Sequence, residues 1–158
     1  MTEIDPKDSL NSLLGKKPWG IALGLGSMLT MEFGSQDPRQ SAVNVHGEWH
    51  LWLYMCSWRL ESDKEIIIAC EDEPEKIKKL LTEISWTEVS SVSLSQPSLD
   101  LEITFHNQCK IRTFSVNASD DHETQQWIFF TPQLVSISAK GNSLVITPNM
   151  EAPPASTR

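Results

Sequence analysis

Basic residues are scarce in this chain. Its 158 residues include 13 Lys and Arg against 21 Asp and Glu, which gives a formal net charge of −8. Binding to nucleic-acid phosphates requires clustered lysine and arginine, and attraction to anionic lipid depends on the same side chains. We therefore expect neither nucleic acid nor a membrane surface as a partner. An acidic surface attracts a basic protein instead.

Cysteines and long apolar runs are also few. The three cysteines include no C-x-x-C pair, which excludes a full disulfide framework. The longest apolar-rich stretch, Trp49 to Trp58, is too short to cross a bilayer. Residues 1–18 lack the apolar segment of an export signal. We therefore expect a cytoplasmic protein.

Glycine motifs for nucleotide binding are missing. The segment LGLGS at 23–27 lacks the third glycine of a dinucleotide fingerprint and the Gly-Lys-Ser/Thr of a P-loop. It is also not a nucleophile elbow, because Ser27 is displaced from the G-x-S-x-G position. A tight hairpin explains it better. We expect no cofactor and no catalytic residues, so the chain is not predicted to be an enzyme.

Two helices are predicted from apolar spacing and capping residues. Asp5 and Pro6 are typical of a helix start, and Gly15 of its end. A second, central helix is predicted over about 72–84, where Asp72 and Glu75 resemble a capping box. Its apolar stripe has i, i+3, i+4, i+7 spacing and consists of Ile77, Leu80, Leu81 and Ile84.

About ten strands are expected around the central helix. The α+β class follows: mostly antiparallel β meanders form a curled sheet or half-barrel, with one central amphipathic helix and a short N-terminal helix. Residues 1–147 are expected to form a single domain, and residues 148–158 a disordered tail. The expected strands are 19–26, 27–34, 47–60, 65–70, 87–94, 99–105, 109–116, 126–131, 134–139 and 143–147.

Two strands share one alternation. LTMEF at 29–33 and LEITF at 101–105 each place three apolar residues on one face, with Glu32 and Glu102 on the outward face. The two meanders can be pseudo-equivalent halves on either side of the central helix. Any half-buried strand has the same pattern, so both interpretations remain open.

The segment HGEWHLWLYMCSWRL, residues 46–60, contains two histidines four residues apart. A zincin motif needs His-Glu-x-x-His on a helix, but here the glutamate comes one place late and the sequel favours a strand. On a strand His46 and His50 would lie about 13 Å apart, too far for one zinc ion. We therefore predict no metal site.

The same segment divides into two faces if it is one extended strand. The first face is apolar and predicted to be core: Trp49, Leu51, Leu53 and Met55. The second carries large side chains with polar atoms: His50, Trp52, Tyr54, Cys56 and Trp58. A helix can cover this second face, or it can line a cleft or a protein interface, where Trp and Tyr are enriched.

Two acidic clusters remain. The cluster at 71–75 is explained by the start of the central helix, whose dipole favours acidic residues there. No such cause applies to Asp120, Asp121 and Glu123, which fall in a predicted loop. That loop is either solvated or a surface for a partner.

A resemblance extends over most of residues 18–147. The arrangement LGLGSMLTMEFG, GEWHLWLYMCSWRLES, helix, LDLEITF and QQWIFFTP resembles small uncharacterised bacterial proteins, some of which are immunity factors encoded near polymorphic toxins. The resemblance implies an inhibitor of a toxin and no catalytic residues. Many nuclease toxins are basic, and an acidic domain can block them through complementary charge.

The leading hypothesis is therefore a non-catalytic protein-binding module, and the resemblance implies an immunity-type inhibitor of a basic toxin. The predicted contact residues are Asp120, Asp121, Glu123, His50, Trp52, Tyr54 and Trp58. The alternative is a small-ligand-binding protein with a cleft lined by Trp and Tyr. A third hypothesis, an enzyme, needs a His or carboxylate cluster that only the folded chain reveals. A homodimer through the Trp-rich face is compatible with each.

Overall fold

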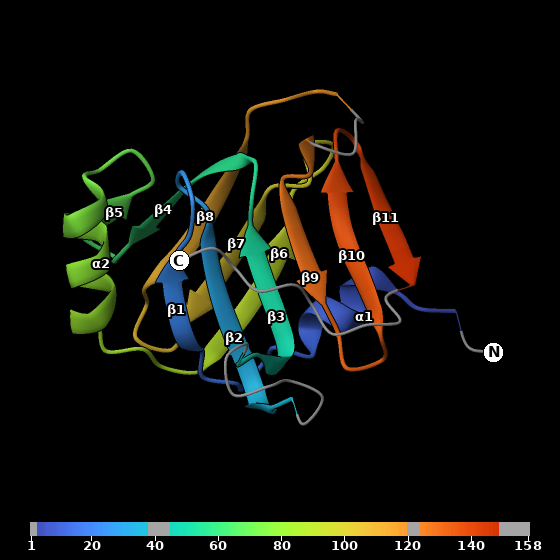
Figure 1. Ribbon diagram of the computed structural model, residues 1–158, viewed down its shortest axis with the longest axis horizontal. Helices are drawn as coiled ribbons and strands as arrows, with labels where there is room; N and C mark the ends of the chain where they lie inside the picture. Colours follow the sequence, from blue (N-terminus) through green and yellow to red (C-terminus); the bar gives the residue numbers. More distant parts are fainter. Residues whose placement is uncertain (1–2, 38–44, 120–123, 149–158) are drawn as a thin grey trace.

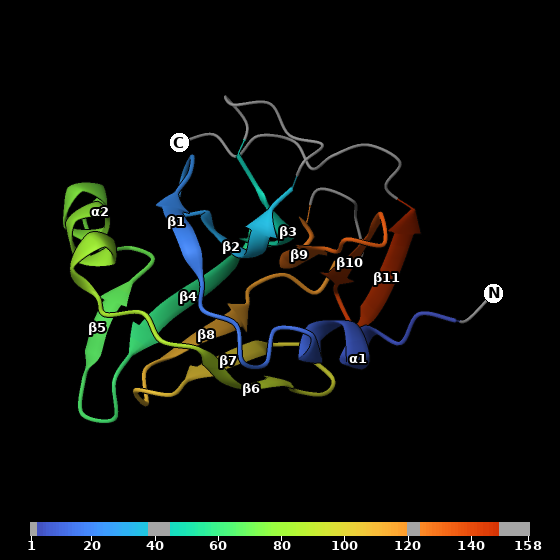
Figure 2. The ribbon, with the colours of Figure 1, turned by 90° about the horizontal axis from the view of Figure 1, so that it is seen from below.

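Two antiparallel sheets are stacked in this protein (Figures 1 and 2). The computed structural model describes residues 3–37, 45–119 and 124–148, and this part of the chain contains eleven strands and two helices. One sheet has the order β1-β2-β3-β9-β10-β11, and the other has the order β5-β4-β8-β7-β6. The predicted α+β class with antiparallel meanders is confirmed, and the sheets do not close into a barrel.

The first sheet contains β1 (Trp19–Leu23), β2 (Leu29–Gln36), β3 (Gly47–Leu53), β9 (Trp127–Phe130), β10 (Val135–Lys140) and β11 (Ser143–Pro148). The second contains β4 (Cys56–Glu61), β5 (Ile66–Ala69), β6 (Val89–Leu94), β7 (Leu101–Phe105) and β8 (Lys110–Ser115). The predicted hairpin at 140–142 is confirmed, because Lys140 of β10 pairs with Ser143 of β11.

The helices are α1 (Pro6–Asn11) and α2 (Pro74–Glu83). Asp5 caps α1 as predicted, its carboxylate accepting the backbone N–H of Lys7 at 2.9 Å. The predicted capping box of α2 is wrong: Glu73 is the N-cap without a side-chain hydrogen bond, and Asp72 accepts the backbone N–H of Ala69 instead. No helix in the described ranges has the length and apolar character needed to cross a membrane.

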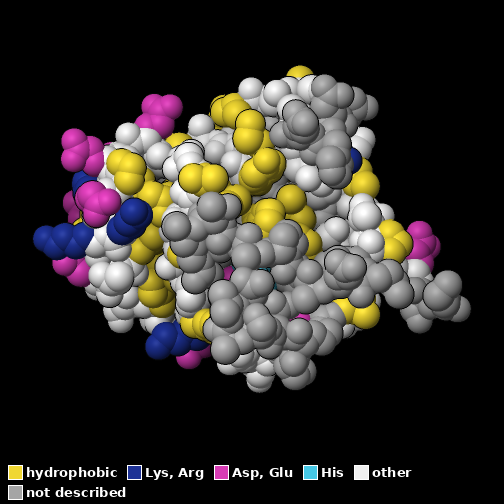
Figure 3. Space-filling model, in the orientation of Figure 1, with side chains coloured by type: hydrophobic (Ala, Val, Ile, Leu, Met, Phe, Trp, Pro, Cys, Tyr) yellow, Lys and Arg dark blue, Asp and Glu magenta, His cyan; other side chains and the backbone are white. Residues whose placement is uncertain are grey.

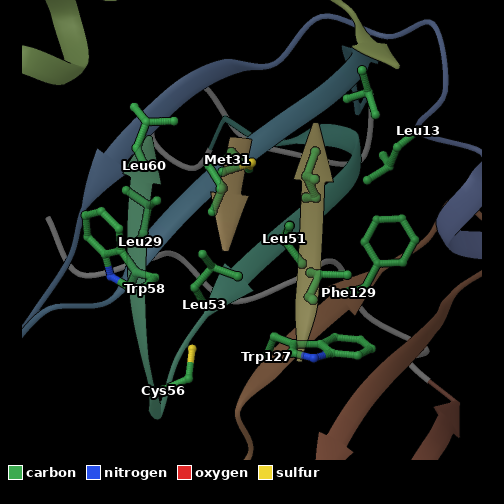
Figure 4. Packing of buried hydrophobic residues seen from close by; sticks show 14 of the residues in the cluster. Leu13, Leu29, Met31, Leu51, Leu53, Cys56, Trp58, Leu60, Trp127 and Phe129 are labelled. Atoms are coloured by element: carbon green, nitrogen blue, oxygen red, sulfur yellow. The ribbon is translucent and has the colours of Figure 1, made fainter. Parts of the chain in front are cut away.

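The core lies between the two sheets and draws side chains from both (Figure 4). Leu51 and Phe129 point inward from the first sheet, and Trp58 and Leu60 from the second. The central helix α2 adds Ile77 to this core. The apolar stripe predicted for α2 is the face that it buries. Burial of apolar area against both sheets is the main stabilising contribution to this arrangement.

The predicted strand over 47–60 is in fact two strands. β3 ends at Leu53 in the first sheet and β4 begins at Cys56 in the second, so the chain changes sheets at Tyr54 and Met55. This corner shifts the alternation of side chains. Tyr54 and Met55 belong to neither strand, and their backbone N–H groups donate to the carbonyls of Gln126 and Gln125. Beyond the corner the even-numbered residues face the core.

Candidate functional site

Glu32, His46 and His50 form a cluster on the face of the first sheet that points away from the core. β2 and β3 are antiparallel, and their register places Glu32 directly opposite His50. Cross-strand neighbours of this kind have Cβ atoms about 5 Å apart. Glu32 and His50 are fully buried and His46 is 2% exposed. Glu32 therefore lies on the outward face, as predicted, but it is buried there.

His46 joins this cluster because the hairpin is irregular where β2 and β3 meet. The register shifts by one extra residue on β2 between Phe33 and Gln36, a β-bulge that contains Gly34 at φ +79°. His46 lies just before β3, and Gly47 approaches β2 so closely that a Cβ would be 2.4 Å from the Phe33 carbonyl oxygen. The chain therefore leaves the straight strand path at Gly47.

The predicted separation of the two imidazoles is wrong for this reason. The ring centroids of His46 and His50 lie 4.2 Å apart, whereas a continuous strand would separate them by about 13 Å. Ligand atoms of Glu32, His46 and His50 all lie within 4.8 Å of one another. The distance argument against a metal site at these histidines no longer holds.

The contacts within the cluster determine where the protons of His50 lie. Nδ1 of His50 is 2.5 Å from Oε2 of Glu32, and the indole N–H of Trp52 donates to Nε2 of His50. An indole nitrogen can only donate, so Nε2 of His50 carries no proton. In the neutral ring, the proton therefore lies on Nδ1 and is donated to Glu32.

Glu32 accepts two further hydrogen bonds. Nδ1 of His46 is 3.3 Å from Oε1, and the backbone N–H of Gly47 donates to the same oxygen at 2.9 Å. Burial alone would raise the pKa of Glu32, but these hydrogen bonds and that of His50 outweigh it, so the pKa lies below its usual value of 4.5. Glu32 is therefore a buried carboxylate held ionised by three N–H donors.

One atom of the cluster is left without a partner. Nε2 of His46 is buried and makes no hydrogen bond within the described part of the chain. Buried polar atoms are nearly always paired, and an unpaired one indicates a ligand, a water or an ion. The cluster therefore has one nitrogen whose protonation is not fixed by a neighbour.

The helices do not cover the face that carries this cluster. α1 packs on β6, while α2 packs on β1 and β5. The interpretation in which a helix lies over the second face of β3 is therefore wrong. Next to His50, the rings of Trp52 and Phe130 meet edge to face at 5.5 Å, and Tyr54 follows Trp52 at 6.5 Å.

The predicted partner-binding residues do not share one surface in the structure. His50 is buried in the cluster, Trp52 is half-buried beside it, and Tyr54 is exposed at the corner. Trp58 is 2% exposed, and its indole N–H donates to the Ser27 carbonyl, so its assignment to the same face as Trp52 is wrong. The predicted residues Asp120, Asp121 and Glu123 lie outside the described residues. Of the predicted disordered tail, 148–158, Pro148 is instead the last residue of β11, and 149–158 lie outside the described residues.

The other residues assigned to the two faces of this segment follow the prediction before the corner and depart from it at the corner. Leu51 and Leu53 are buried core residues, as predicted. Met55, assigned to the core, is 45% exposed, while Cys56, assigned to the second face, is buried. Trp49 is half-buried, with the ammonium of Lys16 lying 4.5 Å from its ring.

An apolar rim surrounds the corner between β3 and β4. We define it by its exposed side chains: Leu25, Tyr54, Met55, Phe114 and Val116. Cys56 pairs with Ser115, so the residues just beyond this pair, Met55 and Val116, lie side by side. Figure 3 shows hydrophobic side chains gathered at this end of the molecule, over the β1–β2 turn and the corner.

A cleft of about 500 Å³ lies on the outer face of the second sheet, beside Phe114. Arg59 and Arg112 line it, and both guanidinium groups are engaged by carboxylates: Arg59 with Glu61 at 2.7 Å and Arg112 with Glu102 at 2.8 Å. The remaining lining residues are Ser57, Trp58, Ala69, Cys70, Glu71, Ser95, Asp100, Leu101, Glu102, Thr113 and Phe114.

The thiol of Cys56 lies near this cleft but is poorly suited to nucleophilic chemistry. Burial, followed by the charges of Cys70 and Asp100, raises its pKa to about 12. A thiol with such a pKa is protonated at neutral pH, and the protonated form is a weak nucleophile.

No protein-family model, curated protein or solved structure matches this chain. The resemblance to immunity-type bacterial proteins therefore stays a prediction.

Sequence reasoning missed Glu32 as a member of the cluster. Two signals could have indicated it. Glu32 is the only charged residue in the strand LTMEFG, and glycines at 34 and 47 flank the predicted hairpin. Glycines inside strands often mark a bulge or a close backbone approach, and either one removes the regular spacing on which the 13 Å estimate depends.

Proposed function

We propose that the protein is a non-catalytic binding module that docks a basic protein on its apolar rim. The observation that carries this proposal is the exposure of five large apolar side chains around one corner, among them Phe114 at 64% and Val116 at 61%. Contiguous apolar surface with polar surroundings is typical of protein interaction sites. Tyr54 adds an aromatic side chain with a polar tip, which is typical of interface hot spots.

Charge supports a basic partner. The chain carries a net charge of −8, and Glu71 and Asp100 line the cleft beside Phe114. In the sequence, Asp120 follows Val116 by four residues, and Asp121 and Glu123 come soon after. A basic surface would be steered toward this end and would bind with apolar contacts at its centre. An immunity-type inhibitor of a basic toxin has this chemistry.

The buried cluster favours a non-catalytic role in this proposal. Glu32, His46 and His50 are 0–2% exposed, so a substrate cannot reach their reacting atoms in this conformation. A general base has to come within hydrogen-bond reach of the proton that it removes.

The test first isolates a partner by pull-down from an extract of the native host and then uses the isolated protein as the ligand in a binding assay. The double variant M55D/V116D is expected to weaken the dissociation constant by at least about 30-fold, because it places charge at the centre of a desolvated interface. Ile146→Asp is the matched control, since Ile146 is exposed on β11 at the sheet edge. Equal affinities for M55D/V116D and the wild type would refute the rim as the docking site.

The contribution of Asp120 and Asp121 to partner binding is tested by measuring the association rate. Charge reversal of Asp120 and Asp121 is expected to slow association and to flatten its dependence on salt, because long-range steering acts on the rate at low ionic strength. The measurement is stopped-flow association at two salt concentrations. An unchanged salt dependence would remove these residues from the proposal.

The cleft on the second sheet supports a small-ligand-binding protein as the second candidate. Its volume lies within the usual range of ligand sites, about 300–1,000 Å³. The cleft lies on the outer face of β4, β7 and β8, and of the aromatic residues predicted for a ligand cleft, Trp52, Tyr54 and Trp58, it is lined only by Trp58. A carboxylate ligand could replace Glu61 or Glu102 on the two arginines. Saturable changes of tryptophan fluorescence that are lost in R112Q support this candidate, and saturation unaffected by R112Q contradicts it.

A further inference from the structure

We propose that Glu32, His46 and His50 together bind a divalent ion of a first-row transition metal. Zn²⁺ serves as the example for the geometry and for the binding tests. This inference is independent of the protein partner proposed above. Two imidazoles and one carboxylate are common ligands of zinc and of its first-row neighbours. With three protein ligands, one tetrahedral position remains for water.

The geometry of the cluster is close to what a zinc ion requires. Ligands bound at about 2.0–2.1 Å in a tetrahedron lie about 3.3 Å from one another. Nδ1 of His46 is already 3.3 Å from Oε1 of Glu32. Nδ1 of His50 is 2.5 Å from Oε2 of Glu32. The distance between these two atoms would have to increase by about 0.8 Å to admit the ion.

The ion would take the place of the two protons that now link the rings to the carboxylate. Binding through Nδ1 requires each neutral ring to carry its proton on Nε2. For His46 this change breaks only the Nδ1 hydrogen bond to Glu32 that the ion replaces, because its Nε2 is unpartnered within the described residues. The partnerless nitrogen thus makes His46 the ring that is ready to bind.

His50 is different because Trp52 opposes the change. The indole N–H of Trp52 points at Nε2 of His50, and two N–H groups cannot share one hydrogen bond. Trp52 must therefore turn away when the metal binds. It is half-buried beside Phe130 and Tyr54, so its fluorescence is expected to report metal binding.

The test begins with chelator-treated wild-type protein titrated with Co²⁺ and Zn²⁺. We expect one ion per chain, a Co²⁺ visible spectrum typical of nitrogen and oxygen ligands, and a saturable change of tryptophan fluorescence. The cysteines are the competing ligands, and thiolate binding gives a strong charge-transfer band in the near ultraviolet. Absence of Co²⁺ binding, or a thiolate band that disappears in C70S, would overturn the proposal.

Variants identify the ligands. E32Q, H46Q and H50Q are each expected to weaken Zn²⁺ binding by more than the 10- to 100-fold that loss of an outer-shell partner costs. H106Q and C70S are matched controls. His106 is exposed, and Cys70 lines the cleft on the second sheet, away from the cluster. Circular dichroism checks the fold of each variant. Zn²⁺ affinities of folded E32Q or H46Q that equal the wild type would contradict the assignment.

Trp52→Phe tests the part assigned to the indole. Phenylalanine keeps an aromatic ring but removes the N–H that holds His50 in its metal-free tautomer. Zn²⁺ affinity is therefore expected to rise by about tenfold, as loss of one competing hydrogen bond allows. A purely packing role of Trp52 predicts equal or weaker binding in W52F, and that result would refute the role of the indole N–H.

Discussion

Glu32 and Glu102 lie on the outward faces of two strands with the same apolar alternation, yet their surroundings differ completely. Glu32 is fully buried and accepts hydrogen bonds from two imidazoles and a backbone N–H. Glu102 is half-exposed and pairs with Arg112 at 2.8 Å and Lys110 at 3.6 Å. A buried ion pair is costly to break because the remaining charge stays desolvated, whereas an exposed pair contributes little.

Glu32→Gln is therefore expected to lower the free energy of unfolding of metal-free protein by about 3–5 kcal/mol at pH 7. Glu102→Gln, the matched control, is expected to lower it by at most about 1 kcal/mol. Urea denaturation in the presence of a chelator measures both. Equal effects of the two substitutions would show that Glu32 is not a buried, hydrogen-bonded carboxylate.

The pKa of Glu32 also determines how stability depends on pH. Since its hydrogen bonds hold the folded pKa below 4.5, its ionised form stabilises the fold above about pH 4.5, and this contribution is lost as pH falls through the folded pKa. The difference in unfolding free energy between wild type and E32Q is thus expected to shrink below pH 4.5. A difference that stays constant from pH 7 to pH 3 would contradict the lowered pKa.

At the scale of the strands, the bulged hairpin of β2 and β3 holds the cluster together. Gly47 lies in contact with β2 and donates its N–H to Glu32. Its close approach to Phe33 leaves no room for a side chain, since a Cβ would lie 2.4 Å from the carbonyl oxygen. The backbone at this point, rather than the spacing of the histidines, brings His46 to Glu32.

Gly47→Ala is expected to lower the free energy of unfolding by more than about 2 kcal/mol, because the clash is with backbone that cannot turn aside. Gly26→Ala is the control: its Cβ would meet open space, and only the positive φ of 65° opposes it, at a cost of about 1 kcal/mol. Thermal unfolding of both variants measures this difference. A smaller loss in G47A than in G26A would be inconsistent with the bulge.

Local patterns predicted most of the elements and failed where the chain bends. The apolar stripe of α2 and the alternation of β7 and β8 are determined by residues close in sequence, and these elements were found within a few residues of their bounds. The corner at Tyr54 and Met55 and the bulge opposite Gly47 depend on contacts between distant strands. Both errors in the site, the distance between His46 and His50 and the face of Trp58, come from these two bends.

At the scale of the whole molecule, both sheets share one core. Side chains of Trp127 in the first sheet and Trp58 in the second belong to the same buried cluster. The chain also crosses between the sheets at the corner after β3. Separating the sheets would expose both inner faces to water, so neither sheet is expected to remain folded alone.

Unfolding is therefore expected to be a single cooperative transition. Tryptophan fluorescence and far-ultraviolet circular dichroism should give the same midpoint in urea, since probes of one two-state transition coincide. Two separate midpoints would show that the sheets unfold independently.

The account depends above all on both imidazoles meeting Glu32, and a long-range ¹H–¹⁵N spectrum of the histidine rings in metal-free protein tests this directly. We predict that His50 has its proton on Nδ1 and an unprotonated Nε2, and that E32Q shifts the ring nitrogens of both His46 and His50 while leaving those of His106 unchanged. A His50 ring protonated on Nε2, or His46 signals that do not respond to E32Q, would contradict the cluster.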